Sequence, residues 1–348
     1  MHNLHDSLLN YLSISFQENA SKESAILKAQ QDLSEKSSPT PKFLYSLFPE
    51  EKQVLLYNIE DGSAGVHKLK VPLNIPSKSV NLYLPQKNYF FIFGGIDPLT
   101  KQISQSSLLC QVDKGYDVLA PMPFPKIHCG TCYIDDCIYF FGGRLQSGQI
   151  TNLCEKFSIK KNLWSTLPNM NEPRSSPGIV SLNSIDIFVF FGLSSKQEVN
   201  NSIEKYNIHE KTWNYIHVLN LVKGFSVTKM DCVPIDKENV LIFGGISLNR
   251  FQEKTAESLA CLSNRVLRFS TKTHSLENFG NLLPNSSLST CPPVVHNSAV
   301  YSLRVFHSQI HPSITELSKI FPVLKISFES NSFSPEIIDE INCCSGRR

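Results

Sequence analysis

Residues 138–143 read Ile138-Tyr-Phe-Phe-Gly142-Gly143, and this stretch decides the fold because similar stretches recur along the chain. The other copies are Tyr89-Phe-Phe-Ile-Phe-Gly94-Gly95, Phe188-Val-Phe-Phe-Gly192 and Val240-Leu-Ile-Phe-Gly244-Gly245. In the copy that ends at Gly192, we read Leu193 as the replacement for the second glycine; a fifth copy, 299–303, has lost both. The first glycines are 48, 50 and 52 residues apart, so the chain contains repeats of about 50 residues.

A second repeating element lies between these glycine-ended runs. Glu155-Lys-Phe-Ser-Ile-Lys-Lys-Asn-Leu-Trp164 matches Glu204-Lys-Tyr-Asn-Ile-His-Glu-Lys-Thr-Trp213. In each copy an aromatic residue, Phe157 or Tyr206, precedes a tryptophan by seven positions, with a polar turn between them. This pattern predicts a β-hairpin. From about residue 50 onward the chain therefore consists of short strands separated by glycine, asparagine, serine and proline.

The glycine pair, the aromatic residue and the tryptophan seven positions later resemble a kelch repeat over about residues 50–340. The resemblance implies an all-β fold, a β-propeller in which four-stranded blades stack around an axis. The repeats count five inner strand pairs and six outer hairpins, the first hairpin beginning at Val54. We expect six blades, with five as the alternative. The resemblance gives a structural role to Gly94, Gly95, Gly142, Gly143, Gly192, Gly244, Gly245, Phe157, Trp164, Tyr206 and Trp213.

The two ends of the chain have a different pattern. Apolar residues at helical spacing, among them Leu4, Leu8 and Leu12, predict one or two short amphipathic helices. We therefore divide the chain into a helical or flexible extension over 1–49, the propeller over 50–340 and a flexible tail over 341–348.

Composition excludes several classes of function. The chain has 348 residues, and 33 Lys+Arg against 31 Asp+Glu give a net charge of +2, which favours neither nucleic acid nor an anionic membrane as a partner. No apolar run approaches the roughly 20 residues of a membrane-spanning helix. The N-terminal residues do not resemble a secretory signal, and the ten cysteines have no framework spacing. We expect reduced thiols and a cytoplasmic location.

One segment has the residue types of a metal site. His128, Cys129, Cys132 and Cys137 lie close together in sequence, but a zinc site usually needs four ligands from two separated pairs. Cys129 and Cys132 are an odd number of positions apart, so a strand points them to opposite faces. We expect buried structural thiols, no metal and no cofactor. The neighbouring Asp135-Asp136 pair predicts a hairpin turn rather than a catalytic dyad.

Basic residues in the loops are the candidates for binding. In the kelch family the loops after the glycine pair and before the inner strand often form the binding face, and basic residues there frequently meet acidic peptides. The matching residues in this chain are Lys126, Arg144, Arg174 and Arg250. Arginine binds carboxylates through two parallel hydrogen bonds, which favours the three arginines over the lysine.

The function that the resemblance implies is a non-catalytic protein-interaction module or scaffold. Kelch proteins are often adaptors of ubiquitin ligases or are associated with the cytoskeleton, which makes proteins of these two groups the expected partners. About 50 N-terminal residues are too few for the BTB domain of the usual adaptors, so an adaptor of this kind needs a separate recruiting partner. The alternative is an enzyme on the same fold, an oxidase or a sugar isomerase or epimerase, with its site in the central channel.

Overall fold

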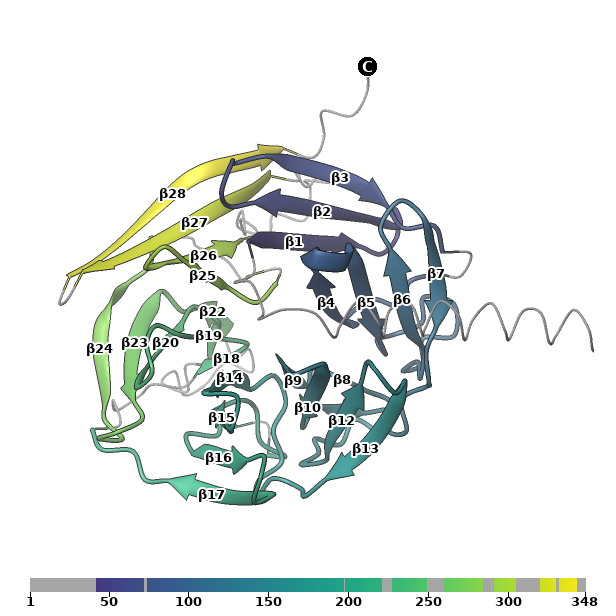
Figure 1. Cartoon of the computed structure of the whole chain (residues 1–348). Helices are drawn as coiled ribbons and strands as arrows, with labels where there is room; N and C mark the ends of the chain where they lie inside the picture. The colour runs from purple at the N-terminus through teal and green to yellow at the C-terminus, as the bar shows by residue number, and fades with distance from the viewer. Residues whose placement is uncertain are drawn as a thin grey trace, which may run out of the picture.

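The computed structural model describes residues 42–71, 74–196, 198–220, 227–248, 260–283, 289, 291–304, 320–329 and 332–342. In this part of the chain the strands form six antiparallel sheets arranged as blades around one axis (Figure 1). The prediction of a kelch-type propeller is confirmed, and six rather than five is the number of blades. The helices predicted before residue 42 lie outside the described residues.

Each blade uses one continuous piece of the chain, numbered I to VI from the N-terminus. Blade I contains β1 (Phe43–Phe48), β2 (Gln53–Asn58) and β3 (Ala64–Lys68). Blade II contains β4 (Val80–Leu84), β5 (Tyr89–Phe93), β6 (Ser107–Gln111) and β7 (Gly115–Val118), with the 3-10 turn η1 (Pro85–Lys87) after β4. Blade III contains β9 (Gly130–Ile134), β10 (Cys137–Phe141), β12 (Cys154–Ser158) and β13 (Leu163–Leu167).

The second half of the ring repeats this order. Blade IV contains β14 (Gly178–Leu182), β15 (Asp186–Phe190), β16 (Ile203–Asn207) and β17 (Thr212–Ile216). Blade V contains β19 (Asp231–Pro234), β20 (Asn239–Phe243), β23 (Arg265–Ser270) and β24 (Leu276–Asn281). Blade VI contains β25 (Val294–His296), β26 (Ala299–Leu303), β27 (Ile320–Glu329) and β28 (Ser332–Asn342).

Two small ladders join loops at the rim of blades III and V. In blade III, β8 (Lys126–Ile127) pairs with β11 (Arg144–Leu145). In blade V, β21 (Ile246–Leu248) pairs with both β18 (Val227–Thr228) and β22 (Ala260–Leu262). These ladders connect the segment before each inner strand to the segment after the glycine pair, so they hold the two kinds of loop side by side.

Blade I differs from the others because three strands are described in it. β1 pairs with β2 only, and its burial resembles that of the second strand of the other blades. Residues 43–48 lack the glycine pair that marks most of the other second strands, which explains why the hairpin beginning at Val54 has no inner partner among the predicted strands. Phe48 of this strand contacts Phe321 of blade VI edge to face, with ring centroids 5.5 Å apart, so β1 contributes to closing the ring.

The core consists of apolar layers between neighbouring blades. One cluster contains Phe93, Phe140 and Phe157 and lies between blades II and III. The next contains Phe141 and Tyr206 and lies between blades III and IV. Further clusters fill the spaces between blades IV and V, between V and VI, and around blade I. A blade buries both faces only when it has a neighbour on each side, which is why the repeats stack into a ring.

The glycine pairs end the second strand of the blades as predicted, with one correction. Gly142 follows β10 directly with φ +62°, and a Cβ on it would lie 2.2 Å from the carbonyl oxygen of Arg174 in the next blade. In blade IV the position after the strand is Phe191, with φ +50°, and Gly192 follows it. Phe191 therefore replaces the first glycine of the pair; reading Leu193 as a replacement for the second was wrong.

Candidate functional site

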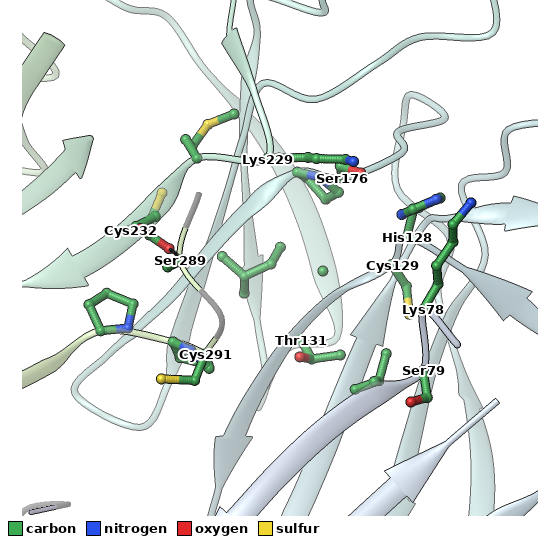
Figure 2. A pocket seen from close by; sticks show the side chains of 18 residues that line it. Lys78, Ser79, His128, Cys129, Thr131, Ser176, Lys229, Cys232, Ser289 and Cys291 are labelled. Carbon is green, nitrogen blue, oxygen red and sulfur yellow. Dashed lines mark hydrogen bonds between the residues drawn. The ribbon is translucent and has the colours of Figure 1, made fainter. Parts of the chain in front are cut away.

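A cavity with a volume of about 460 Å³ lies at one end of the central channel. Five successive blades, II to VI, contribute to its wall, which places it on the axis of the ring (Figures 1 and 2). The wall consists of the residues just before each inner strand and of the first residues of that strand. We call this cavity, with Lys78, His128, Ser176 and Lys229 at its rim, the channel mouth.

These four rim residues occupy the same position in four successive blades. Each lies two residues before an inner strand, namely β4, β9, β14 or β19. All four have left-handed backbone conformations, with φ of +56° at Lys78, +57° at His128, +52° at Ser176 and +55° at Lys229. A non-glycine residue with positive φ is uncommon, and four at equivalent positions indicate a backbone turn that the repeat imposes.

Backbone hydrogen bonds connect three of these turns. The Ser176 N–H donates to the carbonyl oxygen of His128 at 2.7 Å, and the Lys229 N–H donates to that of Ser176 at 3.1 Å. The hydroxyl of Thr228 also donates to the Ser176 carbonyl, at 3.2 Å. Since these groups bind one another across blades, the backbone of the rim is fixed and the side chains are free to face the cavity.

The rim is positively charged. Figure 2 shows the ring nitrogens of His128 next to the amino group of Lys78, with the side chain of Lys229 extending toward them from blade V. Partial burial and the positive charge of Lys78 lower the pKa of Lys229. Burial lowers the pKa of His128 to about 4, with further contributions from Lys229, Lys78 and Arg144, so its ring is neutral at pH 7.

The carboxylate in the cavity wall is already paired with a cation. Asp231 is the one carboxylate among the residues described as lining it, and the side chain is buried. It forms an ion pair with Arg304 of blade VI at 3.1 Å, and the Ser289 hydroxyl donates to its other oxygen at 2.5 Å. Burial raises the pKa of Asp231 in spite of these partners. The described lining therefore offers the lysines no carboxylate that is not already paired.

Two of the predicted binding residues are buried, and each holds the connection before a blade to the third strand of that same blade. Lys126 forms an ion pair with Glu155 at 2.7 Å, and Arg174 forms one with Glu204 at 2.9 Å, with all four side chains fully buried. Arg174 also donates to the carbonyl oxygens of Phe191 and Ser202, both at 2.9 Å. Neither cation reaches solvent. Each is paired with a carboxylate, because an unpaired charge inside the protein would be strongly destabilising.

The two other predicted residues lie elsewhere. Arg144 is half-buried in β11, opposite Ile127 in the ladder, and is close enough to His128 to lower its pKa. It therefore lies beside the channel mouth and stays a predicted binding residue. Arg250 lies outside the described residues, so its role as a binding residue also stays a prediction.

The repeat aromatics lie between neighbouring blades. Trp164 contacts Phe93 of the preceding blade edge to face at 5.7 Å, and Trp213 contacts Phe141 of its own preceding blade at the same distance. The two indole N–H groups donate to backbone carbonyl oxygens of the preceding connection, Trp164 to Ala120 and Trp213 to Pro168, each at 2.8 Å. These tryptophans therefore connect blade III to blade II and blade IV to blade III.

The cysteines of blade III face different layers. Cys129 packs against the cluster between blades II and III, and Cys132 packs against the cluster between blades III and IV, as the odd spacing predicts. Burial raises the pKa of Cys129 to about 11 and that of Cys132 above it. The seven cysteines whose side chains the structure describes are free thiols, and no group of three or more metal-ligating side chains occurs among the described residues.

Sequence reasoning missed two sets of residues. Glu155 and Glu204 occupy the same position in the two hairpin copies. Lys126 and Arg174 also occupy matching positions, because each directly follows a proline. Pairing the two positions could have identified the buried ion pairs. Lys78, Ser176 and Lys229 share a position relative to the inner strands but are not all of one residue type, so the sequence does not mark this position.

The ring of six blades and the glycine-ended second strands define a kelch-type β-propeller. Residues 117–307, more than half of the chain, match the family model described as the Attractin/LZTR1 beta-propeller. The chain therefore belongs to the Attractin/LZTR1 beta-propeller family.

Curated relatives match shorter segments. Beta-scruin of Limulus polyphemus is 28% identical over 116 residues, which cover 32% of this chain and 13% of that protein. Kelch repeat and BTB domain-containing protein 2 of horsepox virus is 29% identical over 112 residues, which cover 27% of this chain and 20% of that protein. The aligned segments thus span a small part of the length of these relatives.

A solved structure, titled the structure of YjhT, corrects one expectation. It aligns with a TM-score of 0.66 at 9% identity and covers 87% of this chain and 99% of that one. An identity this low shows a shared fold and assigns no activity. The whole propeller of this chain is nevertheless shared with that protein, so the expectation that the chain is not an enzyme is withdrawn. Among the described residues no helix has the length and apolarity needed to cross a bilayer.

Proposed function

We propose that this protein is an interaction module that binds an acidic segment of a partner protein at the channel mouth. The observation that carries the proposal is the pair of cationic side chains, Lys78 and Lys229, which occupy equivalent positions of two blades on either side of the titratable imidazole of His128. Their only described acidic neighbour in the cavity wall is the paired Asp231. A cluster of like charges without counter-charges favours an anionic ligand.

The relatives support a protein as the ligand. Kelch repeats and a BTB domain are named together in the poxvirus proteins, and segments of two scruins also align with this chain. We propose that partners come from ubiquitin-ligase or cytoskeletal assemblies, and that the protein acts as an adaptor or scaffold in the cytoplasm. The free thiols of the described cysteines support a reducing compartment.

Site-specific photo-crosslinking tests the proposal. A photoreactive amino acid at Ser79, which lines the cavity, is expected to capture a partner protein, whereas one at the exposed Leu163 on the outer strand of blade III is not. Charge reversal by Lys78→Glu and Lys229→Glu should abolish the crosslink at Ser79. Reversal of the exposed Lys161 and Lys237 serves as the matched control. Equal capture from Ser79 in the Lys78/Lys229 variant would refute the channel mouth as the contact surface.

A further inference from the structure

Resting on the proposed function, we infer that the channel mouth binds a phosphate group, carried by a phosphorylated side chain of the partner protein. The first step is the charge at the rim. Lys78, His128 and Lys229 come from three different blades and line the same cavity. After burial, the charges of Lys229 and Lys78 contribute to the lowered pKa of His128, and that of Lys78 contributes to the lowered pKa of Lys229. Three cationic or potentially cationic groups facing one cavity match a ligand that carries close to two negative charges.

The second step is the kind of hydrogen bond that the rim offers. The ammonium groups of Lys78 and Lys229 can only donate, and the Ser176 hydroxyl can donate as well. A phosphate monoester has a charge of about −1.5 to −2 at pH 7 and three acceptor oxygens, whereas a carboxylate has one charge and two oxygens. Donors that approach from blades II, IV and V around an opening suit a phosphate with three acceptor oxygens better than a planar carboxylate.

The third step is the supporting structure. The backbone bonds from Ser176 to His128 and from Lys229 to Ser176 fix the rim before any ligand arrives. Arg144 adds a positive charge next to His128 without being part of the cavity wall. The groups that face His128 are therefore Lys78, Lys229 and Arg144, all cationic. An entering dianion reverses this local field and favours a protonated imidazole that donates from both nitrogens.

The first arm of the test uses inorganic phosphate. Nuclear magnetic resonance of the histidine side chains in the full chain should show His128 titrating at a higher pH with phosphate than in a chloride buffer of equal ionic strength. The variant Lys78→Ala/Lys229→Ala should lose this difference, and Lys161→Ala/Lys237→Ala should keep it. A His128 titration that phosphate leaves unchanged would overturn the inference.

The second arm separates a protein-borne phosphate from a free one. Three immobilised peptide libraries share degenerate flanks and have phosphoserine, glutamate or serine at the centre. We expect at least about tenfold stronger retention on phosphoserine than on glutamate, equivalent to ~1.4 kcal/mol, which the Lys78→Ala/Lys229→Ala variant loses.

The outcomes separate this inference from the proposed function. Equal retention on phosphoserine and glutamate would overturn phosphate recognition while leaving the binding of acidic segments intact. A phosphate effect on His128 without retention on any library would overturn the partner protein as the carrier and point to a phosphorylated small molecule. If the photoreactive residue at Ser79 captured no partner protein even when Lys78 and Lys229 are unchanged, the proposed function would be refuted.

Discussion

At the scale of single residues, Arg174 shows how a cation in a binding loop becomes part of the core. Its guanidinium lies within blade IV, bound by Glu204 and by two backbone carbonyl groups. We expect Arg174→Met to lower the free energy of unfolding by about 3–5 kcal/mol, because Glu204 then stays buried without its cation. Lys205→Met, which removes the partly exposed pair with Asp186, should cost less than about 1 kcal/mol. Urea denaturation measures both, and similar losses in the two variants would contradict the assignment.

His128 gives the pH dependence at this scale. Burial holds its pKa at about 4 in the folded protein, whereas an unfolded histidine has a pKa of about 6.5. The unfolded state therefore binds more protons between these values, and the stability contributed by the neutral ring is lost as the pH falls from about 6.5 to 4. His128→Asn, a residue that tolerates positive φ, should flatten this part of the stability profile. A slope identical to that of the wild type would exclude His128 as its source.

Residue-level prediction succeeded where the repeat fixes the residue type and failed where it fixes only the backbone. The glycine after β10 and the tryptophans of the hairpins in blades III and IV have a shape or conformation that few residues can replace. The left-handed rim position accepts lysine, histidine or serine, so nothing in the sequence marks it. Lys126 and Arg174 were found, but their burial depends on Glu155 and Glu204 from another strand, which a loop-based reading does not bring together.

At the scale of elements, the turn after each second strand sets the distance between blades. Gly142→Ala would place a Cβ 2.2 Å from the Arg174 carbonyl oxygen, whereas Gly148, also at positive φ (+84°), has no atom within 4 Å of that position. Both variants pay about 1–2 kcal/mol for the left-handed conformation. Gly142→Ala should lose about 1–3 kcal/mol more because blade IV must move. Thermal unfolding of the pair tests this difference, and equal midpoints would refute the close contact.

Strand content could be predicted element by element only where glycine or aromatic signals mark it. β1 has aromatic residues but neither a glycine pair nor the seven-residue step to a tryptophan, and its sequence, Phe-Leu-Tyr-Ser-Leu-Phe, follows two prolines and precedes an acidic turn, so nothing in the sequence separates it from the N-terminal segment. Its burial comes from packing on neighbouring blades, through Tyr45 against Phe90 of blade II and Phe48 against Phe321 of blade VI. Contacts so distant in sequence leave no local pattern.

At the scale of the whole molecule, β1 distinguishes two truncations. Removing residues 1–49 deletes β1 and with it the contact between Phe48 and Phe321, while removing residues 1–41 retains every strand of the described structure. We expect the longer deletion to lower the melting temperature by several degrees more than the shorter one, since it opens apolar surface on both adjoining blades. Differential scanning calorimetry compares the two, and equal melting temperatures would show that β1 does not help to close the ring.

The continuous chain of each blade has a mechanical consequence. In the described residues, blades I and VI share no strand; the contacts that join them include the ring contact of Phe48 with Phe321 and a hydrogen bond from the Tyr45 backbone N–H to the Cys291 thiol at 3.4 Å. Every other junction also has a covalent connection between its blades. The junction between blades I and VI is therefore where the ring should open first under mechanical load or during thermal fluctuations.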